Sequence, residues 1–208
     1  MPGIAAVPVE NEAVSQRQLF GGSISCSFPA RFQDVSDIRD VPSNQEVFVD
    51  PNRDESVIVE LLELKEDVND QSSASWFLED LASEQDAKED LVVEAGGHLS
   101  VTQVPLMDPS TIVNSAVGTL AVSKARESVE ACNSVRVHLA NMRLKNVQTD
   151  LLITVYQPLV ISEHSSSAAA VGVVGSTIPA EHAGFMSVPD IFSLMLRTFK
   201  IEDWGLFG

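Results

Sequence analysis

The sequence predicts an α+β fold, on the basis of three observations. Segments with the strand signature, alternating or β-branched apolar residues, dominate the chain. Only two segments have the spacing of amphipathic helices, one in the middle of the chain and one near its end. Hydrophobic residues make up 44% of the 208 positions, which is enough for a core, and this length favours one domain.

The first ordered elements are expected to be short strands. Residues 1–18 are predicted to form a flexible tail, and 19–208 a single domain. In "SISCSF" (23–28) the apolar residues alternate with serine, as in a strand with one buried face. A second strand is predicted for "EVFVDP" (46–51), where the Asp-Pro pair ends it.

The segment "VIVELLEL" (57–64) has two carboxylates within the most hydrophobic run of the chain. A helix would place Glu60, Glu63 and Asp67 on one stripe. The β-branched start favours a strand instead. In a strand, Glu60 and Glu63 point to opposite faces, unless a bend or the strand end near Leu62 lets both reach one surface.

The remaining elements follow from periodicity and from capping residues. Ser187 and Asp190 form a capping-box-like pair for the last helix, and 162–186 is rich in Ser, Ala and Gly, so we expect a long flexible loop there. The expected elements are a helix within 72–87, strands near 91–95, 99–104 and 112–122, a hairpin of 134–144 with 149–158, and a helix over 187–200.

Negative charge is concentrated in the first half of the chain. The net charge is −17, and residues 1–100 carry −15 of it, from 21 acidic and 6 basic residues. The window 54–94 alone has 14 acidic residues. Such a surface repels nucleic acid and anionic membranes and attracts a basic partner. The alternative is that the acidic residues only keep the protein in solution.

Motifs for catalysis, nucleotides or metals are weak. Two distant cysteines, Cys26 and Cys132, indicate buried free thiols and a reducing compartment. "GVVGST" lacks the lysine of a phosphate loop, and the four histidines are scattered. Glu60 with Glu63 could serve as a general acid and base. Such pairs arise easily in an acidic chain, so we expect no enzyme and no cofactor.

Five segments resemble one known family in order and spacing. They are "LFGGSISCSFP", "DVSDIRDVPSNQEVFVDP", "ESVIVELLEL", "QTDLLITVYQP" and the closing "WGLFG". The chain resembles the Ran guanine nucleotide release factors over about 19–160 and 187–208. The segment "DVPSNQEVFVD" followed by "IVELLE" is the most specific part of the resemblance.

The resemblance implies an antiparallel β-sheet sandwiched by helices, similar to the PsbP proteins of the chloroplast lumen. It also implies a protein of nucleus and cytoplasm that binds the GTPase Ran and promotes nucleotide release. We expect it to be a monomer. Glu60 and Glu63 fall on the family's acidic pair that engages Ran, and the matching upstream residues are Asp34, Arg39, Gln45 and Glu46.

Two alternatives stay open at this point. A PsbP-like photosynthetic protein would share the fold, but it should have a lumen-targeting presequence, and none is visible in the sequence. An acidic adaptor or chaperone for a basic partner would explain the charge without any nucleotide-release activity.

Overall fold

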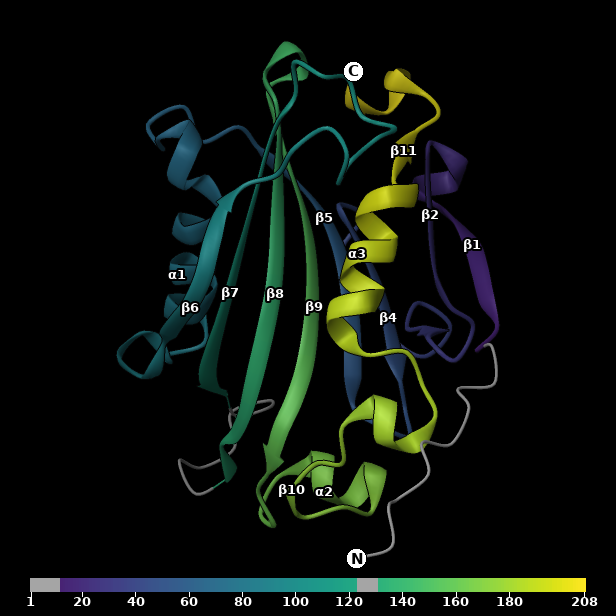
Figure 1. The fold of residues 1–208 in the computed structure, drawn as a ribbon, viewed down its shortest axis with the longest axis vertical. Helices are drawn as coiled ribbons and strands as arrows, with labels where there is room; N and C mark the ends of the chain where they lie inside the picture. The colour runs from purple at the N-terminus through teal and green to yellow at the C-terminus, as the bar shows by residue number, and fades with distance from the viewer. Residues whose placement is uncertain (1–11, 123–130) are drawn as a thin grey trace, which may run out of the picture.

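The computed structural model describes residues 12–122 and 131–208 and confirms the α+β fold (Figure 1). The strands are β1 (Val14–Leu19), β2 (Ile24–Pro29), β3 (Gln33–Asp34), β4 (Gln45–Asp50), β5 (Glu55–Glu63), β6 (Val92–His98), β7 (Ile112–Val122), β8 (Asn133–Leu144), β9 (Thr149–Ile161), β10 (Gly175–Ser176) and β11 (Lys200–Ile201). The α-helices are α1 (Ser73–Glu84), α2 (Ser166–Val171) and α3 (Val188–Thr198). Short 3₁₀ turns include η1 (Phe20–Gly22), η2 (Asp70–Ser72), η3 (Lys88–Asp90), η5 (Lys145–Val147), η6 (Ala180–Ala183) and η7 (Trp204–Phe207).

The strands form two antiparallel sheets. The large sheet has the order β3-β4-β5-β9-β8-β7-β6, and β10 adds to the end of β9. The small sheet has the order β1-β2-β11. The predicted hairpin of β8 and β9 is the centre of the large sheet, and its long strands give the sheet its height in Figure 1. β5, which contains Glu60 and Glu63, pairs with β9 and is therefore an interior strand of the large sheet.

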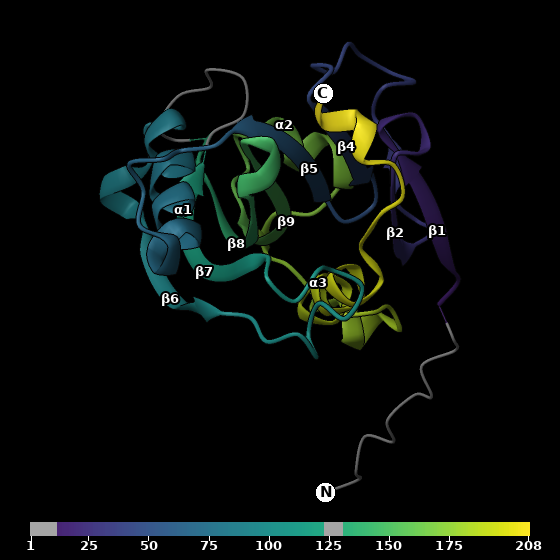
Figure 2. The same ribbon diagram turned by 90° about the horizontal axis from the view of Figure 1, so that it is seen from above.

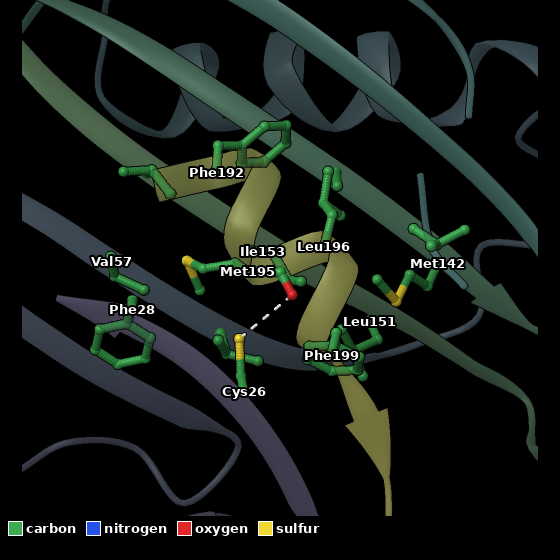
Figure 3. Packing of buried hydrophobic residues seen from close by; sticks show 14 of the residues in the cluster. Cys26, Phe28, Val57, Met142, Leu151, Ile153, Phe192, Met195, Leu196 and Phe199 are labelled. Carbon is green, nitrogen blue, oxygen red and sulfur yellow. Dashed lines mark hydrogen bonds between the residues drawn. The ribbon is translucent and has the colours of Figure 1, made fainter. Parts of the chain in front are cut away.

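The helices cover opposite faces of the large sheet, as Figure 2 shows. α1 packs on β7 and β8, while α3 packs between β9 and the small sheet. Each face therefore has its own apolar core. The larger core, seen in Figure 3, contains Cys26, whose thiol donates to the Met195 carbonyl at 3.6 Å. Burial raises the pKa of Cys26 to about 12, and of the two free cysteines only Cys26 is fully buried.

Capping residues fix the start of α3 as the sequence predicts. The Ser187 hydroxyl accepts from the Asp190 amide at 3.3 Å and donates to the Asp190 carboxylate at 2.6 Å. Val188, Ile191 and Met195 then face the core. This reciprocal pair holds the first turn of α3 in place.

The N-terminal strand β1 corrects the predicted tail. Residues 1–11 lie outside the described residues, but 14–18 pair with β2 in regular antiparallel register. Arg17 stabilises the strand by donating to the Phe32 carbonyl at 2.9 Å and by lying over the ring of Phe28. The polar sequence "SQRQ" does not predict a strand, because β1 is stabilised by pairing with β2 and not by apolar residues of its own.

Two further expectations differ from the structure. Residues 99–104 form turns, and β6 extends to His98 instead. The segment 162–186 holds α2, β10 and η6, and small side chains pack it: Ser167 is buried and accepts from the Asn133 amide at 3.0 Å. Whether this segment is flexible stays a prediction. Low charge and small residues indicate a loop, but they also allow tight packing.

An arginine-centred ion cluster joins the turn between β4 and β5 to the rest of the fold. The Arg31 guanidinium contacts Glu12 at 2.5 Å, Asp50 at 2.8 Å and Glu55 at 2.5 Å. Arg53 pairs with Glu55 at 2.9 Å. Burial opposes the charged form of Arg31, but the bonds and charges of Glu12 and Glu55 outweigh it and leave its pKa raised. The carboxylates of Glu12, Asp50 and Glu55 are thus ion-paired within the fold.

Candidate functional site

The end of β5 presents Glu60 and Glu63 on opposite faces of the large sheet. Val59 and Leu61 pack in the core on the α3 side, and Leu62 packs in the core on the α1 side. The pairing of β5 with β4 and β9 has no bulge. By strand alternation, Glu60 therefore lies on the α1 face, and Glu63 has the direction of the α3 face. The bend that would bring both to one face is not present in β5.

Glu60 is half-buried, and among the described residues its carboxylate accepts hydrogen bonds from two side-chain amides. It accepts from Gln45 Nε2 at 2.6 Å and from Asn44 Nδ2 at 3.5 Å. Burial raises the pKa of Glu60, the Gln45 bond lowers it, and the negative charge of Glu84 adds to the rise. No basic side chain among the described residues forms an ion pair with Glu60. The Glu60 carboxylate therefore has hydrogen-bond donors but no cationic partner among the described residues.

The end of α1 and the strand β9 complete this corner of the sheet. Gln85, the C-terminal cap of α1, lies close enough to Tyr156 on β9 to lower the pKa of its hydroxyl in part. Burial raises the pKa of Tyr156, and the charges of Glu60 and Glu84 raise it further. No pattern in the sequence indicated Glu84 or Gln85. Tyr156 is the single tyrosine of the chain and lies in a predicted strand, so alternation along that strand could have indicated it.

Glu63 is the last residue of β5 and is exposed. β4 begins at Gln45, opposite Glu60, so the final residues of β5 have a strand neighbour only on the β9 side. Three residues of strand separate the two carboxylates by about 10 Å along β5. A partner that covers this end of the strand would contact both of them, although they leave the sheet on different faces.

Two of the four upstream residues of the predicted site lie on β4 next to β5. Gln45 is directly opposite Glu60 and bonds it. Glu46 faces the other way and accepts from the Phe20 amide at 2.6 Å. Within this fold, Glu46 thus fixes the turn before β2, and only Gln45 shares the surroundings of Glu60.

The other two upstream residues, Asp34 and Arg39, lie away from Glu60, on β3 and on the connection from β3 to β4. Asp34, on β3, accepts from the amide and the hydroxyl of Ser36 at 2.8 and 2.7 Å, which closes a turn. Arg39 is exposed on the connection from β3 to β4. The structure does not bring Asp34 or Arg39 into contact with Glu60, and their role in partner binding stays a prediction.

A buried ion cluster fixes the acidic connection between β5 and α1. Arg143 contacts Asp150 at 3.2 Å and Asp70 at 2.8 Å, and it donates to the carbonyls of Val68 and Lys65. The Lys145 ammonium, by its hydrogen bond to Asp70, lowers the pKa of that carboxyl. Nothing in the sequence showed that Asp70 meets Arg143 and Lys145, because more than 70 positions separate them. The cluster holds the connection between β5 and α1 in place just before α1 begins.

Neither a metal-ligand cluster nor a membrane-spanning helix is found in the described ranges. No group of three His, Cys, Asp or Glu side chains among residues 12–122 and 131–208 is arranged to hold a metal ion. Within the same residues, no helix has the length and apolar content needed to cross a membrane. The predicted structural role of His138 fits its place in β8, where burial, with the charge of Arg136, lowers its pKa to about 4.

Comparison with known proteins shows the family of this chain. The family model described as Ran-interacting Mog1 protein matches residues 17–158. The chain belongs to the Mog1 family. A Ran guanine nucleotide release factor from Danio rerio is 37% identical over 196 residues, 92% of this chain and 99% of the relative. A human protein of the same name is 39% identical over 67% of this chain and 74% of its own length.

Other Mog1-family members extend the comparison to fungi and to solved structures. A nuclear import protein of Schizosaccharomyces pombe is 32% identical over 92% of this chain and 99% of its own length. The crystal structure of the Saccharomyces cerevisiae Ran-binding protein Mog1p aligns with a TM-score of 0.65 over 95% of this chain and 100% of the other, at 22% identity. The family resemblance and the α+β fold are confirmed. The likeness to PsbP proteins stays a prediction.

Proposed function

We propose that this chain binds the small GTPase Ran and promotes release of its guanine nucleotide in nucleocytoplasmic transport. Membership of a Ran-interacting family and the names of the relatives support a Ran-directed, regulatory role. The site itself needs no cofactor and performs no covalent chemistry, so the protein acts by binding. The other parts of the proposal are a monomer, no contact with nucleic acid or membrane, and a place in nucleus and cytoplasm.

The half-buried carboxylate of Glu60 is the observation that carries the proposal. Its burial already disfavours the charged form, and no described cation compensates it. A lysine or arginine from a partner would supply that cation through a charge-assisted hydrogen bond. The paired strands and Gln45 hold the side chain in place, so binding costs little additional ordering entropy.

Nucleotide release would follow from competition for cations. In a GTPase, lysine, backbone amides and Mg²⁺ hold the phosphates. Glu60 and Glu63 at the end of β5 would pair with basic or switch-region groups of Ran. In the absence of this protein, those groups bind the phosphates and Mg²⁺ of the nucleotide. The phosphates and Mg²⁺ are then held less tightly, and the nucleotide dissociates faster.

Release of labelled nucleotide from purified Ran tests the proposal. Glu60→Lys and Glu63→Lys should abolish the stimulated release, since like charges facing a basic patch cost several kcal/mol. Glu163→Lys is the matched control, because Glu163 is 70% exposed and follows the opposite end of β9. Circular dichroism should show an intact fold for all three variants. Wild-type release by a folded Glu60→Lys protein would refute the site.

The acidic adaptor remains the second candidate because of the clustered charge of residues 54–94. It predicts a different pattern in the same assay. Binding to Ran would weaken by the same factor in the Glu60→Lys and Glu163→Lys variants, and no variant would stimulate release. A loss confined to the end of β5 distinguishes a built site from general charge.

A further inference from the structure

Strand β6 forms an unshielded outer edge of the large sheet. It pairs with β7 on one side, and no strand in the described part of the chain pairs with its other side. All seven residues of β6 are exposed, and Figure 1 shows the strand at the left margin of the sheet. In an edge strand, alternate residues direct their N–H and C=O groups away from the sheet. β6 therefore has main-chain hydrogen-bonding groups free for another strand.

The usual protections of an edge are weak in β6. Proteins shorten their edge strands or place Lys or Pro in them. β3, at the opposite edge, has two residues, whereas β6 has seven and contains neither Lys, Arg nor Pro. A bulge between Val93 and Ala95 interrupts the strand, and Glu94 at this bulge is paired with Arg136 at 3.0 Å. The last four residues of β6, after the bulge, remain regular.

A shallow hollow lies over this regular part of β6. Its volume is about 220 Å³, and it is lined by Ala95, Gly96, Gly97, His98, Ser115 and Val117. Gly96 faces α1, since a side chain there would meet Ser75 at 3.3 Å. A side chain at Gly97 would meet nothing within 4 Å. The small residues thus leave room for a bulky side chain that reaches over the edge from an added strand.

Charge decides between the two kinds of strand that could be added. A second copy of the chain would bring another net charge of −17, and the acidic Glu89 and Asp90 stand directly before β6. Like charges at this edge disfavour self-association. A strand with lysine or arginine side chains is instead attracted to it.

We propose that β6 receives an extended basic segment of another protein as an additional strand. Main-chain bonds to residues 95–98 would supply the pairing, and one bulky apolar side chain would occupy the hollow. This edge is separate from the end of β5, where Glu60 and Glu63 lie, because three strands stand between β5 and β6 in the sheet order. The protein could hold such a segment and Ran at the same time.

A designed peptide tests the proposal with the full chain. The fluorescent probe is Lys-Val-Lys-Val-Lys-Phe-Lys-Val-Lys, and its control is the same sequence N-methylated at alternate residues, which keeps the charge but removes main-chain donors. Fluorescence anisotropy should show binding of the probe and at least about tenfold weaker binding of the control. Amide hydrogen exchange should slow at residues 95–98. Equal binding of both peptides, or protection elsewhere, would overturn the proposal.

Two variants locate the binding at the hollow. Ala95→Leu fills it from an exposed position, and we expect about tenfold weaker probe binding with Ran binding unchanged. Ala169→Leu, an exposed alanine of α2, is the matched control and should bind like the wild type. If Ala95→Leu binds the probe normally, the hollow is not used and the proposal fails. A dimer of the free protein in sedimentation that Val93→Lys dissociates would make the occupant a second copy, which also overturns it.

Discussion

Asp150 and Glu60 both lie in central strands of the large sheet, on the face that carries α1, but their surroundings differ. Asp150 is fully buried and accepts from Arg143 at 3.2 Å, from Asn141 at 3.0 Å and from the Lys65 amide at 2.9 Å. Glu60 is half-buried and accepts only from amide side chains. Where the fold uses a buried carboxylate for its own stability, it supplies an arginine. Among the described residues no arginine pairs with Glu60, and its role in partner binding stays a proposal.

The largest expected effect concerns the paired carboxylate. Asp150→Ala should destabilise the protein by about 3–5 kcal/mol, because it leaves the buried Arg143 without its innermost counter-charge. For a chain of this size, this corresponds to a fall of about 6–20 °C in Tm. Thermal unfolding followed by circular dichroism measures it. A change below about 1 kcal/mol would show that the cluster is not needed for stability, and the comparison with Glu60 would lose its basis.

A smaller loss is expected at the second arginine-centred cluster. Arg31→Met should destabilise the protein by about 2–3 kcal/mol, since Glu12 and Asp50 lose their charge partner while Arg53 still pairs with Glu55. Urea denaturation gives the change in free energy of unfolding. Arg39→Met is the matched control, because Arg39 is exposed, and it should stay within about 0.5 kcal/mol of the wild type. Equal effects of the two substitutions would contradict the assignment.

The association rate with Ran should depend on salt if the acidic surface steers binding. The net −15 of residues 1–100 implies a fall of about tenfold in the association rate from 0.05 to 0.5 M salt, because screening shortens the range of the charges. Stopped-flow mixing measures this rate. A rate that stays constant over this range would mean that the charge serves solubility alone.

The smallest expected effect separates function from stability at Glu60 itself. The folded-state pKa of Glu60 is raised above its ordinary 4.5, so its stabilising contribution is present at low pH and is lost as pH rises through the folded value. At pH 7 the charged carboxylate therefore costs the wild type stability, and Glu60→Gln should be slightly more stable, by less than about 0.5 kcal/mol because solvent screens this half-exposed group.

Thermal melts of this variant at pH 7 and pH 4 test the sign of the effect. The advantage of Glu60→Gln should shrink toward pH 4, where the wild-type carboxylate takes up a proton. Glu63→Gln, at an exposed position, should show no such difference. A Glu60→Gln protein that is less stable than the wild type at pH 7 would mean that the charge of Glu60 is paired within the fold.

The separate locations of the two β5 carboxylates show the limit of prediction from sequence. Alternation along a strand predicts that Glu60 and Glu63 diverge, and the register confirms it. The same pattern could not show that α1 covers only β6 to β8 and leaves the Glu60 corner with Glu84 and Gln85 beside it. How much of the sheet face α1 covers depends on the length and path of the connection between β5 and α1, which Arg143 holds in place. No local sequence pattern predicts that path.

By itself, the sequence determined the class of fold, the strands β2, β4, β5, β8 and β9, the helices α1 and α3 with the Ser187 cap, and the concentration of acid in the first half of the chain. These features depend on propensity, periodicity and charge, which can be recognised from residues that are neighbours in the sequence. Only the tertiary structure decided that β1 is a strand, that Arg143 pairs with Asp150, and that Glu60 has no ion-pair partner among the described residues. Sheet register and helix packing choose these contacts from many that the sequence would allow, even where the partners, such as Arg143 and Asp150, are only seven positions apart.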